Sequence, residues 1–491
     1  MALSLLFLTA LALPAAAGIS STPDCPANGV LTASIPGSGY LATMAAVHDH
    51  LIACRDTIEH LDLRAYLSGC SEWPDRWNLP FALTGGNSSV SSNEQQQGDL
   101  SSTSSSYYYP ALKSLKLEGY EFKESDWTDL QPRKYESYVW WVQSSRFRRW
   151  LKLWWSTPRE RRYLTNLELW LEAMDWGALE RLEFAEDVSA YFVDVGAQHL
   201  TSRLRDLAVG AGWRNGSRDA ATRLFTTALP REVRLERLAW TDPRWDPAAL
   251  DPILDQHGAS LRRLELWSHE RWYPVEAEAE AAAALNASQV QRIAESAPNL
   301  EHLSLKVYRS GDEDVWPWEV FEAVASAPQL ASADVWLDLA AFCMRGVPEF
   351  PGARSQRERE GCKAGEEYRR PFLNLTSASD IFRFMREKKA GPVELERLTF
   401  WVGDWERPWD GPIYDESWIE GRNARVDCSV IRPDGSRAET AEEDLCEFIK
   451  NPADDWAFDE VEFEDGLPRI IATSTDEEDQ ELLQLQKQMA L

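Results

Sequence analysis

The chain has few basic side chains for its size. It contains 51 lysine and arginine residues against 80 aspartate and glutamate residues, a formal net charge of -29 over 491 residues. Neutralising phosphates requires a basic surface, so this composition excludes a generic nucleic-acid-binding protein. Broad adsorption to an anionic membrane is disfavoured for the same reason.

Apolar runs long enough to cross a bilayer are also lacking. An apolar segment from Ala2 to Leu13 precedes Pro14 and three alanines. It is shorter than the roughly 20 residues that a membrane-spanning helix needs, so we expect no membrane span. The pattern predicts a signal peptide over residues 1–17 and a secreted, extracellular protein. A buried N-terminal helix is the alternative.

Catalytic and metal-binding signatures are mostly missing. The sequence has no H-E-x-x-H, no G-x-S-x-G, no phosphate-binding glycine loop and no C-x-x-C pair. We therefore expect no enzyme, no catalytic residue, no metal and no cofactor. A secreted carbohydrate hydrolase remains an alternative, because two carboxylates suffice for glycoside hydrolysis and acids are dense among the tryptophans of residues 404–418.

The cysteines fall into two groups, three near the N-terminus and four in the last third. They are Cys25, Cys54, Cys70, Cys343, Cys362, Cys428 and Cys446. In an exported protein this distribution predicts local disulfides. We expect Cys343 to pair with Cys362, Cys428 to pair with Cys446, and two of the first three to pair. The odd count leaves one thiol free or intermolecular.

Four Asn-x-Ser/Thr sequons occur, at Asn87, Asn215, Asn286 and Asn374. None has proline at its central position. Together with a signal peptide they predict an N-glycosylated protein.

Internal repetition is the strongest feature of the sequence. An apolar-x-x-apolar-x-apolar motif begins at Ile58, Leu112, Leu164, Leu179, Leu204, Leu235, Leu261, Leu300, Leu330 and Leu395. Most copies are spaced as one strand plus one helix per repeat would require. Helical stretches before Leu300 and Leu330 each end at a Ser-Ala-Pro sequence, and proline forces the chain out of the helix.

These motifs resemble the leucine-rich repeat superfamily, in particular the irregular strand-helix repeats of fungal and F-box-type leucine-rich-repeat proteins. No F-box is visible. The resemblance implies an α/β leucine-rich-repeat-like solenoid, a curved parallel sheet with helices on its convex face. The expected organisation is an N-terminal cap and first repeat over 18–84, a disordered Ser/Gly-rich loop over 85–106, an irregular solenoid over 107–470 with an inserted loop over 345–370, and an acidic tail over 471–491.

The fifth and seventh motif positions should project from the concave sheet, because side chains alternate across a strand. They pair acids with tryptophans as Glu168 and Trp170, Glu265 and Trp267, and Asp334 and Trp336, and a fourth repeat supplies Trp401. Tryptophan stacks on sugar rings, aromatic side chains and cations. These residues predict a concave groove that binds a protein, a cationic peptide or a glycan.

Two alternatives to this groove remain. The tryptophans can be covered to form a wider core, and a register slip of one residue would bury all of them. An intracellular F-box-type substrate adaptor is a further alternative to a secreted binding protein.

Overall fold

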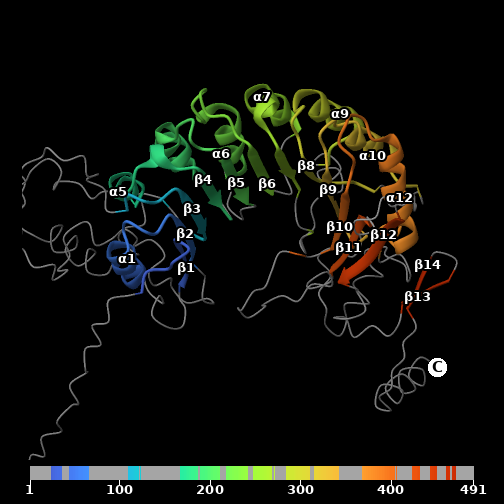
Figure 1. Cartoon of the computed structure of the whole chain (residues 1–491), viewed down its shortest axis with the longest axis horizontal. Helices are drawn as coiled ribbons and strands as arrows, with labels where there is room; N and C mark the ends of the chain where they lie inside the picture. Colours follow the sequence, from blue (N-terminus) through green and yellow to red (C-terminus); the bar gives the residue numbers. More distant parts are fainter. Residues whose placement is uncertain are drawn as a thin grey trace, which may run out of the picture.

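The protein folds around one long, open and mostly parallel β-sheet with helices on one side (Figure 1). The structure is a computed structural model, and it describes residues 24–35, 44–65, 109–120, 122, 166–185, 188–210, 217–241, 247–267, 270, 284–309, 315–341, 368–403, 405, 423–431, 443–450, 461–464 and 467–470.

The main sheet contains 12 strands that follow one another in chain order. They are β1 (Val30–Ile35), β2 (His60–Ala65), β3 (Ser114–Glu118), β4 (Arg181–Phe184), β5 (Asp206–Gly210), β6 (Arg237–Thr241), β7 (Arg263–Leu266), β8 (His302–Lys306), β9 (Ser332–Leu337), β10 (Arg397–Gly403), β11 (Asn423–Ile431) and β12 (Glu443–Lys450). Strands β1 to β10 pair in parallel. The antiparallel strands β11 and β12 complete the sheet, and β13 (Val461–Glu464) pairs with β14 (Leu467–Ile470) separately.

Helices alternate with the parallel strands. The α-helices are α1 (Met44–Ala53), α5 (Asn166–Ala173), α6 (Ser217–Arg223), α7 (Leu250–His257), α9 (Ala287–Ser296), α10 (Trp318–Ala325) and α12 (Leu375–Lys388). Short 3-10 or π segments are η2 (Trp176–Ala178), η3 (Phe192–Gly196), η4 (Ala197–His199), η5 (Leu224–Ala228), η6 (Pro247–Ala249) and η7 (Gly258–Ser260).

The core lies between the sheet and these helices. The three apolar positions of each strand motif point into it, as Leu261, Leu264 and Leu266 show with at most 1% of their surface exposed. Helix α9 contributes Val290 and Ile293 from the opposite side. Burial of one strand face and one helix stripe therefore explains why the motif recurs.

All but one of the ten motifs form strands of the parallel sheet. The exception is the motif at Leu164, whose described part is helix α5 rather than a strand. Its buried residues Leu167, Trp170 and Met174 are three and four positions apart, which places them on one face of a helix. The 15-residue step to the next motif at Leu179 is too short for a second strand-helix unit.

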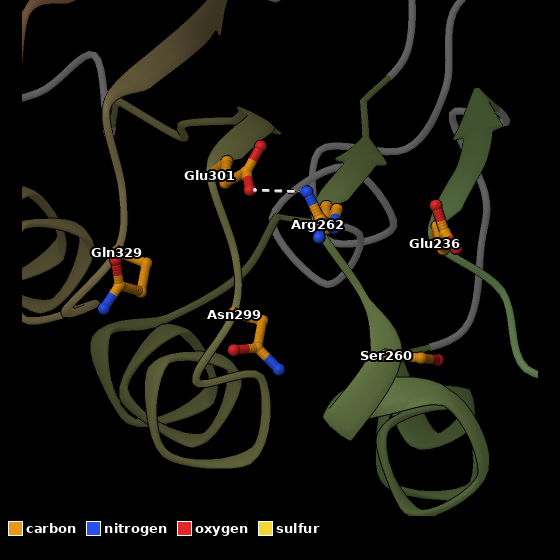
Figure 2. Close-up of a pocket in the computed structure, with 6 residues that line it drawn as sticks. All are labelled: Glu236, Ser260, Arg262, Asn299, Glu301 and Gln329. Carbon is orange, nitrogen blue, oxygen red and sulfur yellow. Dashed lines mark hydrogen bonds and ion pairs between the residues drawn. The ribbon is translucent and has the colours of Figure 1, made fainter.

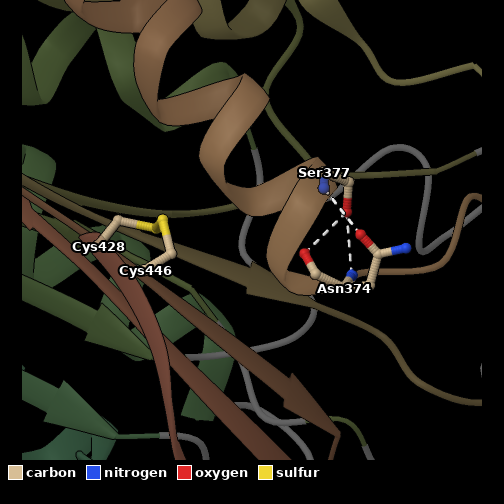
Figure 3. Close-up of a disulfide and its surroundings, with 4 residues drawn as sticks. All are labelled: Asn374, Ser377, Cys428 and Cys446. Carbon is tan, nitrogen blue, oxygen red and sulfur yellow. Dashed lines mark hydrogen bonds between the residues drawn. A yellow bond between two sulfur atoms is a disulfide. The ribbon is translucent and has the colours of Figure 1, made fainter. Parts of the chain in front are cut away.

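Two disulfides join residues close in sequence. Cys428 pairs with Cys446 across β11 and β12, as expected, near the start of α12 (Figure 3). Cys25 pairs with Cys54, which confirms a pair among the first three cysteines. Cys343 and Cys362 lie outside the described residues.

Other sequence predictions also fall outside the described residues. They concern the signal peptide at 1–17, the loop at 85–106, the tail at 471–491, most of the insertion at 345–370, and the sequons at Asn87 and Asn215. No helix in the described ranges combines the length and apolarity needed to cross a bilayer.

Candidate functional site

The sheet face opposite the core, called the polar face below, carries three rows of side chains that follow the strand register. The first row is His60, Ser114, Arg181, Asp206, Arg237, Arg263, His302, Ser332, Arg397 and Ser429. The second row is Asp62, Lys116, Glu183, Ala208, Ala239, Glu265, Ser304, Asp334, Thr399 and Asp427. The third row is Arg64, Glu118, Gly210, Thr241, Lys306, Trp336, Trp401 and Arg425.

Three of the predicted tryptophans meet on this face. The rings of Trp267 and Trp336 stack with centroids 3.7 Å apart and planes at 3°. Trp336 also stacks on Trp401 at 5.1 Å and 7°. Its indole N–H donates to Ser304 Oγ at 2.9 Å, and only 7% of Trp336 is exposed. Both faces of Trp336 are therefore occupied, and a ligand ring has no free face of this indole to stack on.

The end of the stack near β11 is closed by a cation and another indole. The guanidinium carbon of Arg425 lies 4.6 Å from the Trp401 ring centroid. Asp427 holds that guanidinium with hydrogen bonds of 2.9 and 2.6 Å. The Trp405 ring meets Trp401 edge-on at 4.8 Å. We call Trp267, Trp336 and Trp401 the tryptophan stack.

The prediction for Trp170 is wrong in location. Trp170 lies on helix α5 and is fully buried, not on the polar face. Its indole N–H donates to Tyr120 Oη at 3.0 Å, and burial raises the pKa of that tyrosine. Glu168 lies on the same helix, so it does not belong to a strand either. The segment forms a helix instead of the expected strand because the apolar residues around the Leu164 motif have helical spacing.

The predicted acid Glu265 is already paired with two arginines. Its Oε1 accepts from Arg237 Nε at 2.8 Å and from Arg263 Nε at 2.5 Å. Burial pushes the pKa of Glu265 upward, but the two guanidiniums outweigh it and bring the pKa below its ordinary value. Arg237 in turn bridges to Asp206 at 3.0 Å. A cationic ligand would have to compete with these contacts.

The predicted acid Asp334 faces a histidine on the neighbouring strand. His302 Nε2 lies 3.4 Å from Asp334 Oδ2, and His302 Nδ1 lies 2.8 Å from Ser332 Oγ. Sequence reasoning missed His302 and Ser332 because no local motif links residues 30 positions apart. Their register across β8 and β9 brings them together.

The polar face is nearly neutral on a strongly acidic chain. From β2 to β11 the three rows contain eight basic and seven acidic side chains, a net charge of +1 with histidines neutral. The chain as a whole carries -29. The acids therefore do not form the acidic surface that a cationic peptide requires.

Beyond the tryptophan stack, a buried ion cluster anchors the chain at the ends of β8 and β9. Asp338 contacts Lys306 at 2.8 Å and Arg369 at 3.2 Å. Burial pushes its pKa upward, yet these cations lower the pKa of Asp338 overall. Arg309 donates to Pro371 O at 2.5 Å, and burial lowers the pKa of Arg309 to about 10. The cluster holds the segment that starts at residue 368 against the sheet.

A polar groove lies at the opposite ends of the strands, where the chain enters β7 and β8. Figure 2 shows its lining residues, Glu236, Ser260, Arg262, Asn299, Glu301 and Gln329. The groove has a volume of about 370 Å³. Arg262 pairs with Glu301 at 3.1 Å, and both side chains are more than half exposed. Such pairs contribute little to stability.

The acidic segment at residues 404–418 lies outside the described residues, except for Trp405. Within the described ranges, no group of three histidine, cysteine, aspartate or glutamate residues is placed to hold a metal ion.

Comparison with solved structures finds a distant likeness to a leucine-rich repeat-containing protein. The crystal structure of the leucine-rich repeat-containing protein LegL7 from Legionella pneumophila is 12% identical over 46% of this chain, with a TM-score of 0.25. The alignment spans 58% of that protein. No family model matches the chain, and no curated protein matches it.

Proposed function

We propose that this protein is an extracellular, glycosylated, leucine-rich-repeat-like solenoid that binds a protein partner on its polar face. The strand-helix repeat supports the solenoid, and in Figure 1 the row of strands bends into an arc with helices on its outer side. Solenoids of this kind present extended concave surfaces to their partners. The two disulfides are in keeping with an oxidising compartment.

The near neutrality of the polar face is the observation on which the proposal depends. It also restricts the charge that the partner's surface can carry. Glu265 and Asp427 are neutralised by arginines of the same face. The partner surface is therefore uncharged or has balanced charges. It contacts the exposed members of the first row, which include Arg181, Arg397 and Ser429. The tryptophan stack lies along the third row, with the second row between it and the first, and its rings are held by one another.

Site-specific photo-crosslinking tests this function. A photoreactive residue is placed at Arg181 or at Ser429 on the polar face, and at the exposed Glu295 on α9 as a matched control. The probes are incubated with cell-surface and culture-medium proteins of the native host. We expect the same partner protein to be captured from both polar-face positions and not from Glu295. Capture from Glu295 alone would refute binding on the polar face.

Salt dependence separates a neutral partner from a cationic one. Exposed charge pairs weaken as ionic strength rises, whereas apolar and neutral hydrogen-bonded contacts persist. We expect crosslinking yield to change little between low and high salt. A yield that collapses in high salt would restore the cationic-peptide interpretation.

The extracellular part of the proposal has its own test. Intact mass of the protein recovered from the native host's culture medium, before and after glycosidase treatment, should show removal of residues 1–17 and attached glycans. Protein found only inside cells, with Met1 retained and no glycan, would support the intracellular adaptor instead.

A further inference from the structure

The polar face brings a serine, a histidine and a carboxylate together on two adjacent strands. Ser332 Oγ is 2.8 Å from His302 Nδ1, and Asp334 Oδ2 is 3.4 Å from His302 Nε2. His302 on β8 is in direct register with Ser332 on β9. We propose that Ser332 is a nucleophile for the hydrolysis of carboxylic esters, with His302 as its general base and Asp334 as a positioning residue.

The hydrogen-bond geometry suits this division of roles. A neutral imidazole with its proton on Nε2 leaves Nδ1 free to accept the Ser332 hydroxyl proton. Asp334 stands on the Nε2 side and favours that tautomer. His302 Nε2 and Asp334 Oδ1 are buried, and neither has a hydrogen-bond partner among the described residues. The 3.4 Å approach of Asp334 Oδ2 to His302 Nε2 is therefore a close contact rather than a hydrogen bond, and it places the carboxylate on the Nε2 side of the ring.

The surroundings of Ser332 supply a positive charge. Arg397 on β10 is in register with Ser332 and is exposed. Its Nε donates to Thr399 Oγ1 at 3.2 Å, which positions the guanidinium on the side of Ser332 away from His302. Ser332 itself is half-buried, unlike the covered Trp336 two strand-face positions further along. A negative charge that develops on a substrate oxygen would be stabilised by Arg397.

The reaction balances with water as the only co-reactant. Ser332 Oγ forms a bond to the ester carbonyl carbon while its proton passes to His302 Nδ1, and the carbonyl π electrons move to the oxygen beside Arg397. The tetrahedral species then re-forms the carbonyl and breaks the bond to the alcohol oxygen, which takes the proton from Nδ1 and leaves. Water then forms a bond to the acyl carbon while Nδ1 takes its proton. The bond from that carbon to Ser332 Oγ breaks, Ser332 Oγ takes the proton back from Nδ1, and the carboxylic acid leaves. Asp334 stabilises each transient imidazolium.

This activity goes beyond partner binding, and the two can be tested separately. The full chain is treated with a fluorophosphonate probe, and the adduct is located by peptide mass spectrometry. We expect one adduct, on Ser332. Absence of an adduct on Ser332 in folded wild-type protein would overturn the proposal, and this result does not depend on any variant folding.

Hydrolysis of p-nitrophenyl acetate gives the second readout. We expect Ser332→Ala and His302→Asn each to lower the rate by about a hundredfold, within the range usual for loss of a base or nucleophile. Asp334→Asn should lower kcat with KM unchanged. Ser202→Ala is the matched control, because Ser202 is exposed just before β5 and lies outside the three rows of the polar face. If Ser332→Ala had the circular dichroism spectrum of the wild type and an unchanged hydrolysis rate, another residue would be the nucleophile. That result would overturn the proposal.

Discussion

Trp267 and Trp336 stack face to face with ring centroids 3.7 Å apart. Trp267 directly follows β7 and Trp336 lies on β9, so strand β8 lies between them in the sheet. Adjacent strands are about 4.8 Å apart, so the two indoles must lean toward each other over β8 to meet. Lys306 of β8, in register with Trp336, is buried and pairs with Asp338. Lys306 therefore links the third row of the polar face to the buried ion cluster around Asp338.

The parallel stack should produce a spectroscopic signal. Two indoles at this distance and angle couple their electronic transitions, so we expect a tryptophan exciton couplet in the far-ultraviolet circular dichroism spectrum. Trp267→Phe should abolish most of it. Trp318→Phe, which removes a half-buried indole on α10 outside the stack, should leave it intact. Persistence of the couplet in Trp267→Phe would show that these rings do not stack.

Trp170 should behave as a core residue. It is 0% exposed, so Trp170→Ala should lower the free energy of unfolding by about 3–5 kcal/mol in urea titrations. Leu171→Ala on the same helix, at a half-buried position, should cost clearly less. If Trp170→Ala and Leu171→Ala lowered the free energy of unfolding by equal, small amounts, Trp170 would be exposed and available for binding.

Stability should fall in mild acid because of His257. Burial, assisted by the positive charge of Arg234, lowers the pKa of His257 to about 4 in the folded protein, against its ordinary value of 6.5. Below pH 6.5 the unfolded chain gains a proton that the folded chain does not. The stability present above pH 6.5 is therefore lost as pH falls toward 4, by about 3 kcal/mol from this residue.

Urea titrations near pH 7.5 and pH 4.5, values chosen to bracket the transition, measure this loss. Burial also lowers the pKa of His48, which acts in the same direction. The loss between the two pH values should shrink in His257→Leu. His199→Leu, at an exposed position, should match the wild type. An identical loss in His257→Leu and wild type would contradict the assignment.

Capping and glycosylation can be separated at Asn374. The Asn374 side chain accepts from Ser377 N–H at 2.8 Å, and Ser377 Oγ accepts from Asn374 N–H at 2.9 Å (Figure 3). Asn374→Ala should therefore destabilise α12 by about 1 kcal/mol in thermal or urea unfolding. Asn374→Asp should retain the cap. Thr376→Ala removes the sequon but leaves the capping pair, so only its glycan mass should change.

Much of the fold follows from local patterns in the sequence. The motif at Leu261 is a strand because its alternate leucines meet one core. The helix before Leu300 ends at Ser296, two residues before Pro298, because proline cannot continue a helix. The Leu164 motif has the same letters, yet it forms helix α5. Trp170 and Met174, which follow this motif, continue its apolar pattern with a helical period. The spacing over this longer segment favours a helix over a strand.

The amino-acid sequence by itself determined the repeat, the core-facing leucines and the Cys428–Cys446 pair, because each depends on residues near one another in the chain or on a simple alternation. Only the tertiary structure decided that Trp267 lies on Trp336, that Arg237 neutralises Glu265, and that Ser332 faces His302. Those contacts join residues 28 to 69 positions apart, and strand register brings them within reach. Register arises when many buried side chains pack at once, so no single segment of the sequence specifies it.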